Sequence, residues 1–350
     1  MQIVGALDVH RRQITFLTLE LASGESRRGR ISPAAREPFR AWLEQFVGMQ
    51  AEFALEGTTG WRFIVEEIER AGHLARLADP AETAGRRGRK RRAKTDDSDC
   101  ALQLRLLLAG ELPEAWIPPA HVLELRTRVR LRKTLIDQRT AWLQRLQAQL
   151  FHQGVTAGIK PRTLAGRQEL ATVDVSPAGR DVIELCSRML DQLDREIGPI
   201  DRALGSFARR QPGCRALTEH LYGVGAVTAT AILAELGDAR RFRSSDDAVR
   251  HSGLDITVWQ SDQKRAAGHL SHQGPELLRW ALFEAAQCAA RRSSPDHSYY
   301  LQVANRLDHN RACLSVARKL CRRAHHILRE LGDAALAPPN AAKTIVGAAA

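Results

Sequence analysis

The sequence lacks the features that mark membrane and secreted proteins. No apolar run reaches the roughly 18 residues that a transmembrane helix needs, so we expect no membrane span. The opening residues, MQIVGALDVH, do not form a signal-peptide pattern, and we expect a cytoplasmic location. The six cysteines are scattered without a C-x-x-C pair, which argues against a zinc site and against a disulfide framework.

Acidic residues are also in deficit. The chain has 350 residues with 40 Asp and Glu against 52 Lys and Arg, a net charge of +12. Its 44% hydrophobic and 26% charged residues are typical of a globular protein, and the length allows two or three domains. A basic excess of this size favours a polyanionic partner, either nucleic acid or an anionic membrane. Since no membrane segment is present, we expect nucleic acid.

The first 115 residues predict an α/β domain. Apolar and β-branched runs indicate four strands, IVGALDVH, QITFLTLEL, AEFALEG and HLARLAD, and GRISP is expected to add another after the second. Ser32 and Pro33 are expected to begin a helix that runs to about Val47, followed by a helix in WRFIVEEIERAG. A further helix is expected from about Asp96 to Ala109. Strands followed by strand–helix alternation are typical of α/β or α+β domains.

The rest of the chain predicts an all-α region. In residues 116–210, apolar residues recur at three- and four-residue steps from Val122 to Leu150 and again from Ile183 to Leu204. This spacing predicts two long helices in a coiled-coil arm, although Arg132 and Arg139 interrupt the first seam; a plain helical bundle is the alternative. Residues 211–333 predict a helical C-terminal domain, and residues 334–350 a flexible tail.

Four carboxylates are placed to converge. Asp8 ends the first predicted strand, Glu56 ends the fourth, and Asp96 and Asp99 lie three residues apart on one helix face. Crowded carboxylates repel unless cations neutralise them, and hard oxygen ligands suit Mg²⁺. Two such ions can clamp the attacking and leaving oxygens of a phosphodiester. The residues therefore predict a Mg²⁺ site, although helix capping alone would also explain Asp96 or Asp99.

Two features suit phosphate binding. Seven of the nine residues from Arg86 to Lys94 are basic, and we expect these to contact nucleic-acid backbones, unless the loop is merely solvated: Arg86, Arg87, Arg89, Lys90, Arg91, Arg92 and Lys94. The Gly223–Gly225 turn between two short helices resembles a helix-hairpin-helix, whose N–H groups can bind phosphate. An ordinary glycine turn is the alternative.

The polar stretch WQSDQKR contains Ser261, whose hydroxyl could attack phosphorus if a base or metal activates it. Lys264 and Arg265 follow directly and are expected to contact nucleic acid. Taken alone, a serine in a polar stretch is a weak signal.

The order of several motifs resembles a known family. GALDVH, ALEGTTGW, KTDDSDCALQL, the G-V-G unit and HSGLDITVWQSDQKRAAGH occur in this order in the DEDD-type insertion-sequence transposases of the IS110 family, the bridge-RNA-guided recombinases. The resemblance runs from about Val4 to Arg292. It implies an RNase-H-like (RuvC-like) N-terminal domain, a coiled-coil arm and a C-terminal transposase domain.

The resemblance also implies residue roles. It maps the acidic tetrad onto Asp8, Glu56, Asp96 and Asp99, and the nucleophilic serine onto Ser261, with Ser271 as the fallback because the Ser-Ser-Gly-Gly stretch of many relatives is absent here. It implies Mg²⁺, element-end and target DNA, a structured guide RNA, a homo-oligomer (a dimer or tetramer) and a bacterial, nucleoid-associated protein. Two alternatives remain: a Holliday-junction-type nuclease that uses water, and a non-catalytic nucleic-acid-binding protein.

Overall fold

The computed structural model describes residues 2–86, 95–155, 158–257, 260–261, 264–265, 268–271 and 273–339. The chain forms two compact units, Met1–Ile117 and Pro118–Ala350. Within the described ranges, no helix combines the length and the apolar character needed to cross a membrane.

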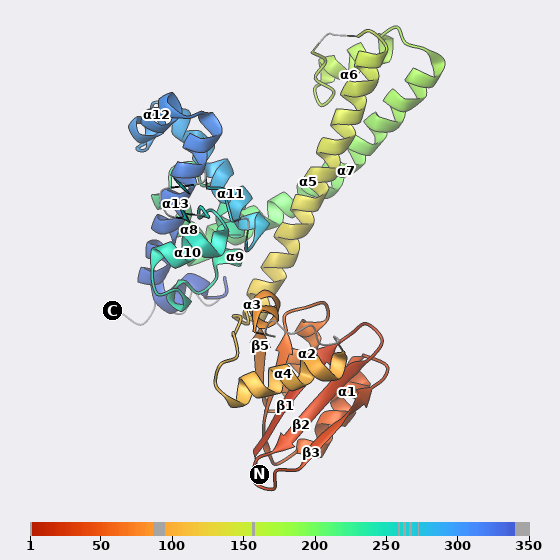
Figure 1. Cartoon of the computed structure of the whole chain (residues 1–350). Helices are drawn as coiled ribbons and strands as arrows, with labels where there is room; N and C mark the ends of the chain where they lie inside the picture. Colours follow the sequence, from red (N-terminus) through yellow and green to blue (C-terminus); the bar gives the residue numbers. More distant parts are fainter. Residues whose placement is uncertain are drawn as a thin grey trace, which may run out of the picture. The chain divides into compact units, whose positions relative to one another are not determined.

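The first unit is built on a five-stranded mixed sheet (Figure 1). Its order is β3-β2-β1-β4-β5; β2 runs antiparallel to both of its neighbours, while β1, β4 and β5 run parallel. All five strands predicted from the sequence are present: β1 (Gln2–Val9), β2 (Ile14–Glu20), β3 (Ser26–Ile31), β4 (Gln50–Glu56) and β5 (Leu74–Ala78). This mixed α/β architecture fits an RNase-H-like domain.

Helices cover both faces of the sheet. Leu7 and Phe53 belong to the core that includes Phe39 of α1 and Ile64 of α2. On the opposite face, Val4 and Ala6 pack with the helix α4. The helical elements of this unit are α1 (Arg36–Leu43), the 3-10 turn η1 (Glu44–Phe46), α2 (Trp61–Arg70), α3 (Pro80–Gly85) and α4 (Asp96–Leu108).

The start of α1 differs from the sequence prediction. Ser32 does not cap this helix: β3 continues to Ile31, and the N-cap is Ala35, which makes no side-chain cap hydrogen bond. The backbone N–H of Ala34 donates to the carbonyl of Arg12 at 3.1 Å instead. This contact ties the segment after β3 to the β1–β2 turn before the helix begins.

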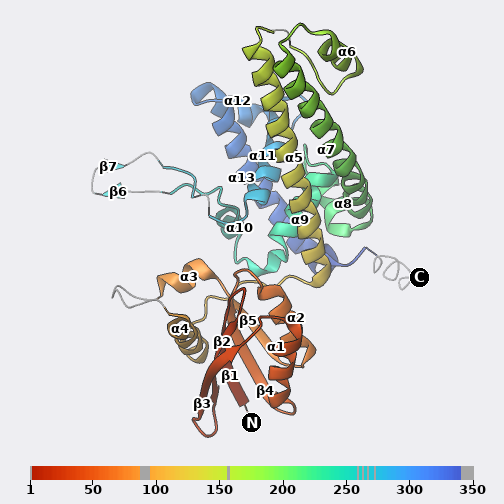
Figure 2. The ribbon, with the colours of Figure 1, turned by 90° about the vertical axis from the view of Figure 1, so that its right-hand side faces the viewer.

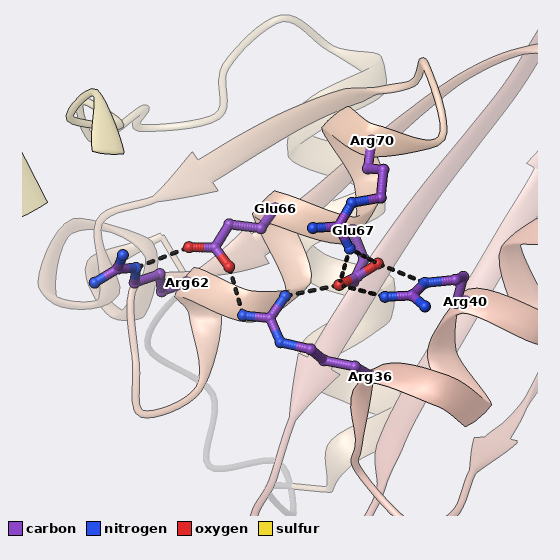
Figure 3. A network of polar contacts seen from close by, with 6 residues as sticks. All are labelled: Arg36, Arg40, Arg62, Glu66, Glu67 and Arg70. Carbon is purple, nitrogen blue, oxygen red and sulfur yellow. Dashed lines mark hydrogen bonds and ion pairs between the residues drawn. The ribbon is translucent and has the colours of Figure 1, made fainter. Parts of the chain in front are cut away.

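A buried carboxylate joins α1 to α2. The side chain of Glu67 is 1% exposed, and its oxygens lie 2.9 Å from Arg40 Nε, 2.7 Å from Arg36 Nη1 and 2.6 Å from Arg70 Nη1 (Figure 3). Hydrogen bonds from Arg40, and then from Arg36 and Arg70, lower the pKa of Glu67 to about 2, although burial opposes the shift. Glu66 lies at the edge of this network, between Arg36 and Arg62.

We expect Glu67→Gln to destabilise the first unit by about 2 kcal/mol at neutral pH. The value is below the roughly 3 to 5 kcal/mol typical of broken buried pairs because the three guanidiniums are about half exposed. A lowered carboxyl pKa stabilises the fold above the ordinary pKa of 4.5 and loses this effect as the pH falls toward about 2. Denaturant unfolding at several pH values should therefore show the variant and the wild type converging in acid.

Glu66→Gln is the matched control, because its carboxylate is 31% exposed and pairs at the surface with Arg36 and Arg62. We expect a loss below about 1 kcal/mol. Equal losses in the two variants would contradict a special role for Glu67.

The second unit begins with two long helices that pack antiparallel: α5 (Ala120–His152) and α7 (Pro177–Arg210), with α6 (Leu164–Thr172) between them in sequence. Arg132 and Arg139, which interrupt the apolar seam of α5, pair across it with Asp201 and Asp194 of α7. At the far end of the pair, an apolar cluster contains residues of both helices: Leu146, Leu150, Ile183, Cys186 and Leu190.

The base of α5 is fixed to α9. Arg130 forms a bidentate ion pair with the buried Glu235, in which Nε lies 2.9 Å from Oε1 and Nη2 lies 3.0 Å from Oε2. Arg126 Nε donates to the carbonyl of Ala234 at 2.6 Å. The end of α9 is therefore held by two arginines from one face of α5.

The remaining elements form a helical domain around one large apolar core. Figure 2 shows the helices together with the β6–β7 segment. The elements are α8 (Pro212–His220), α9 (Ala226–Leu236), η2 (Ala239–Arg241), α10 (Ser245–Ser252), β6 (Gln260–Ser261), β7 (Lys264–Arg265), α11 (Glu276–Gln287), η3 (Cys288–Ala290), α12 (His297–Arg306), α13 (His309–Leu331) and η4 (Gly332–Leu336).

Candidate metal centre

Two carboxylates lie at neighbouring strand ends. In β1, Val4 and Ala6 face α4, so the alternation of a strand places Asp8 on the same face. The parallel register pairs Leu7 with Leu55, so the next residues, Asp8 and Glu56, lie side by side at the ends of β1 and β4. Adjacent strands are about 4.8 Å apart, and both carboxylates point toward the α4 face.

The N-terminus of α4 supplies the other two carboxylates. The Thr95 side chain accepts from the Ser98 N–H and the Ser98 hydroxyl accepts from the Thr95 N–H, so a capping box fixes the first turn. Asp96, Asp97 and Asp99 lie in this turn, where the helix dipole favours negative charge. Asp99 is buried and Asp97 is exposed.

His10 bridges two of the acids, a contact that sequence reasoning missed. Its Nε2 lies 3.0 Å from Asp8 Oδ2 and 3.2 Å from Asp96 Oδ1, and Gln13 Nε2 donates to Asp96 Oδ2 at 3.5 Å. The motif GALDVH could have indicated this contact, because side chains two residues apart in an extended chain, such as Asp8 and His10, point to the same side. Asp8 has a 14% exposed side chain, whereas His10 is half exposed.

The surroundings of Asp8 disfavour the charged form of its carboxyl group. Burial raises the pKa of the Asp8 carboxyl, and the neighbouring Asp96 and Asp99 act in the same direction, while His10 opposes them. Asp99 is thus close enough to Asp8 to act on it electrostatically. Such crowding is relieved by a cation.

The donor atoms fit a divalent cation. Among the described residues, Asp8, His10 and Asp96 each offer one ligand atom, and the three atoms lie within 4.8 Å of one another. Glu56 and Asp99 do not belong to this triplet; they border it, from the adjacent strand end and from the same helix turn. Carboxylate oxygens suit Mg²⁺ and Mn²⁺, and an imidazole nitrogen is better tolerated by Mn²⁺.

Most of the basic loop lies outside the described residues. Arg86 is described and lies 3.7 Å from Glu111 Oε2 in an ion pair. The other six basic residues predicted to bind phosphates lie outside the described part: Arg87, Arg89, Lys90, Arg91, Arg92 and Lys94.

The Gly223–Gly225 turn joins α8 to α9 and is packed against α11. Gly223 has φ +85°, and a Cβ there would lie 2.4 Å from the carbonyl oxygen of Ala285, so only glycine fits this turn. Gly225 is the N-cap of α9, and its N–H donates to Thr228 Oγ1 at 2.9 Å. That N–H is therefore already used within the turn.

Ser261 lies in a short β-ribbon between α10 and α11. It pairs with Lys264, and Gln260 pairs with Arg265, in an antiparallel ladder. Nothing is described of the side chains of these four residues. Ser271 lies at the base of the same connection, where its hydroxyl donates to the carboxylate of Asp255.

A mixed sheet with a carboxylate cluster at its strand ends is typical of metal-dependent enzymes that act on phosphodiesters. Two family models match the chain: "Transposase", the DEDD model of the IS110 group, over residues 6–152, and "Transposase IS116/IS110/IS902 family" over residues 215–302. The chain belongs to the IS110 family of transposases.

Curated relatives agree with this assignment. The chain is 27% identical over 227 residues to an insertion element IS116 protein of Streptomyces clavuligerus, covering 62% of this chain and 56% of the relative. It is 30% identical over 242 residues to a protein of Sinorhizobium fredii whose name describes a candidate transposase, covering 63% and 60%. It is 26% identical over 208 residues to the transposase of IS1111A from Coxiella burnetii, covering 56% of each. The chain thus spans less than two thirds of the length of these relatives.

Proposed function

We propose that this protein cuts and rejoins DNA as the recombinase of a mobile insertion sequence. The observation that carries the proposal is the cluster of Asp8, His10 and Asp96, where the end of β1 meets the first turn of α4. The family membership supports the same class of reaction. A Holliday-junction-type nuclease that uses water, or a non-catalytic binding protein, would be the alternatives.

Within this proposal, Asp8, Glu56, Asp96 and Asp99 hold Mg²⁺. When bound, the metal supplies charge neutralisation and Lewis-acid activation at the phosphate. The capping box holds Asp96 and Asp99 in one orientation, and β1 and β4 hold Asp8 and Glu56, so four ligands come from three rigid elements. Rigid support of this kind keeps ligands in place without a cost at the moment of reaction.

The nucleophile in this proposal is Ser261. Its hydroxyl oxygen would form a bond to phosphorus while the bond to the departing DNA oxygen breaks, leaving a free hydroxyl on that end. Attack by a second DNA hydroxyl would reverse the step and release the serine. The placement of Ser261 on a ribbon in the second unit fits a subunit arrangement in which one copy supplies the carboxylates and another the serine.

The same proposal extends to the nucleic-acid contacts and the domain roles. Residues 1–115 would be the catalytic domain, residues 116–210 a coiled-coil arm, residues 211–333 the serine-bearing domain with its helix-hairpin-helix turn, and residues 334–350 a tail. The basic loop, Gly223, Gly225, Lys264 and Arg265 would contact phosphates of DNA or of a structured guide RNA. The active form would be a dimer or tetramer.

The direct test incubates the purified protein with its flanking element DNA, the transcribed non-coding segment and Mg²⁺. Strand cleavage with a DNA–protein adduct supports the proposal. Cleavage without any adduct would favour the nuclease, and binding without cleavage would favour the non-catalytic protein.

His10→Ala should weaken metal binding about 10-fold or more, because a removed ligand or ligand-positioning group typically costs 10- to 100-fold in affinity. Titration of Mn²⁺ followed by its electron paramagnetic resonance signal measures this without any assay of activity. His121→Ala is a control on α5, outside the triplet. Unchanged Mn²⁺ affinity in His10→Ala would show that His10 merely fills space between the two acids.

A further inference from the structure

The two faces of the edge strand β3 carry different charges. The register pairs Thr15 with Arg30 and Leu17 with Arg28, and Thr15 and Leu17 lie on the α4 face of β2. Arg28 and Arg30 therefore share the face of the sheet that carries Asp8, since Asp8 pairs with Thr15. Arg27 and Gly29 lie on the opposite face, where Gly29 contacts Phe16.

Both arginines are available to a ligand. Arg28 and Arg30 are exposed, and α4 packs over β1, β2 and β4 rather than over β3. Within the described part of the chain, no carboxylate lies at ion-pair distance from either guanidinium, whereas Arg27 is paired with Glu25 at 3.0 Å. Within the described residues, Arg28 and Arg30 therefore have no acidic partner, whereas Arg27 has one.

The two arginines also lie at a useful distance from the carboxylates. Asp8, Thr15 and Arg30 form one row across three adjacent strands, so the backbones of Asp8 and Arg30 are two strand spacings, or about 10 Å, apart. Arg28 lies two residues farther along β3, about 7 Å away. An extended arginine therefore reaches a phosphate one or two nucleotides from a phosphate held at Asp8.

We propose that Arg28 and Arg30 form a track that holds the backbone of the DNA strand whose phosphate lies at the metal centre. The inference rests on the proposed function, because only a strand engaged at Asp8 would run along this row. Charge complementarity selects a polyanion, and the shared face with the carboxylates selects the strand being cut. Arginine contacts to phosphates fix the position of a DNA strand without reading its sequence, so the track would position the DNA rather than select it.

The test compares Arg28→Ala/Arg30→Ala with Arg27→Ala, a matched control that removes a cation from the same strand but the other face. Binding of a fluorescein-labelled DNA duplex of mixed sequence is followed by anisotropy over a range of salt concentrations, with Ca²⁺ in place of Mg²⁺ so that the carboxylates are neutralised while cleavage is suppressed. The slope of log affinity against log salt should flatten by about 1.8 in the double variant, about 0.9 for each lost phosphate contact. It should not change in Arg27→Ala.

An unchanged slope in the double variant would overturn the track and leave the arginines as charges that protect a sheet edge from pairing. A slope change seen only with an RNA duplex of the same sequence would overturn DNA as the occupant. Because the measurement needs no cleavage, a protein that fails to cut DNA would refute the proposed function without changing this result. Thermal unfolding of each variant confirms that the fold is intact.

Discussion

Asp8→Asn should reduce metal-dependent DNA cleavage by at least about 10³-fold. The substitution keeps the shape of the side chain but removes a charged ligand from the end of β1, where burial and two neighbouring acids already disfavour charge without a cation. Several kcal/mol of transition-state stabilisation by the metal would be lost, and each 1.4 kcal/mol corresponds to a tenfold rate change. Cleavage of end-labelled element DNA over time gives the rate, and DNA binding should be mostly retained.

Asp97→Asn is the matched control, because Asp97 lies in the same first turn of α4 but is exposed to solvent. It removes the same charge from the same helix end and should leave the rate nearly unchanged. If both variants lost activity to the same extent, a general loss of negative charge, rather than of a metal ligand, would be the cause.

Ser261→Ala should abolish the covalent DNA–protein adduct, because alanine offers no oxygen to attack phosphorus. The adduct is detected by the altered migration of labelled DNA on a denaturing gel. Mixing the Asp8→Asn and Ser261→Ala proteins should restore partial activity if one subunit supplies the carboxylates and another the serine.

Ser271→Ala separates the two candidate serines. Ser271 donates to Asp255 at the base of the ribbon, so its loss should affect the local structure more than the chemistry. An adduct that persists in Ser261→Ala and disappears in Ser271→Ala would reassign the nucleophile. An active wild-type protein that never forms an adduct would favour water as the nucleophile.

The strands, and the places of the four acids in β1, β4 and α4, could be predicted because each depends on a local pattern; that the four acids act as metal ligands stays a prediction. Runs of apolar and β-branched residues predicted four of the five strands, and the positions of Asp8 and Glu56 near strand ends follow from where those runs stop; β3, with the sequence SRRGRI, contains no such run. The family was also correctly predicted, from motifs in a fixed order.

Features that depend on register or on long-range contacts could not be predicted. The contact of His10 with Asp96 joins residues far apart in sequence, and the common face of Arg30 and Asp8 depends on the pairing of three strands. A slip of one residue would have moved Arg30 to the other face. Ser32 was wrongly predicted as a helix cap because a serine before a proline satisfies the local rule while Ile31 still belongs to a strand.

Arg126 and Arg130 couple the orientation of α5 to the position of α9. Arg126 and Arg130 hold the end of α9 at the base of α5, while Arg132 and Arg139, two and nine residues beyond Arg130, pair with α7. Beyond Arg130, α5 continues to His152 over about 33 Å, so a tilt of about 5° at this base displaces the tip of the helix by about 3 Å. A tilt of α5 at this base would therefore move the C-terminal end of α9, because Arg126 and Arg130 tie Ala234 and Glu235 directly to α5.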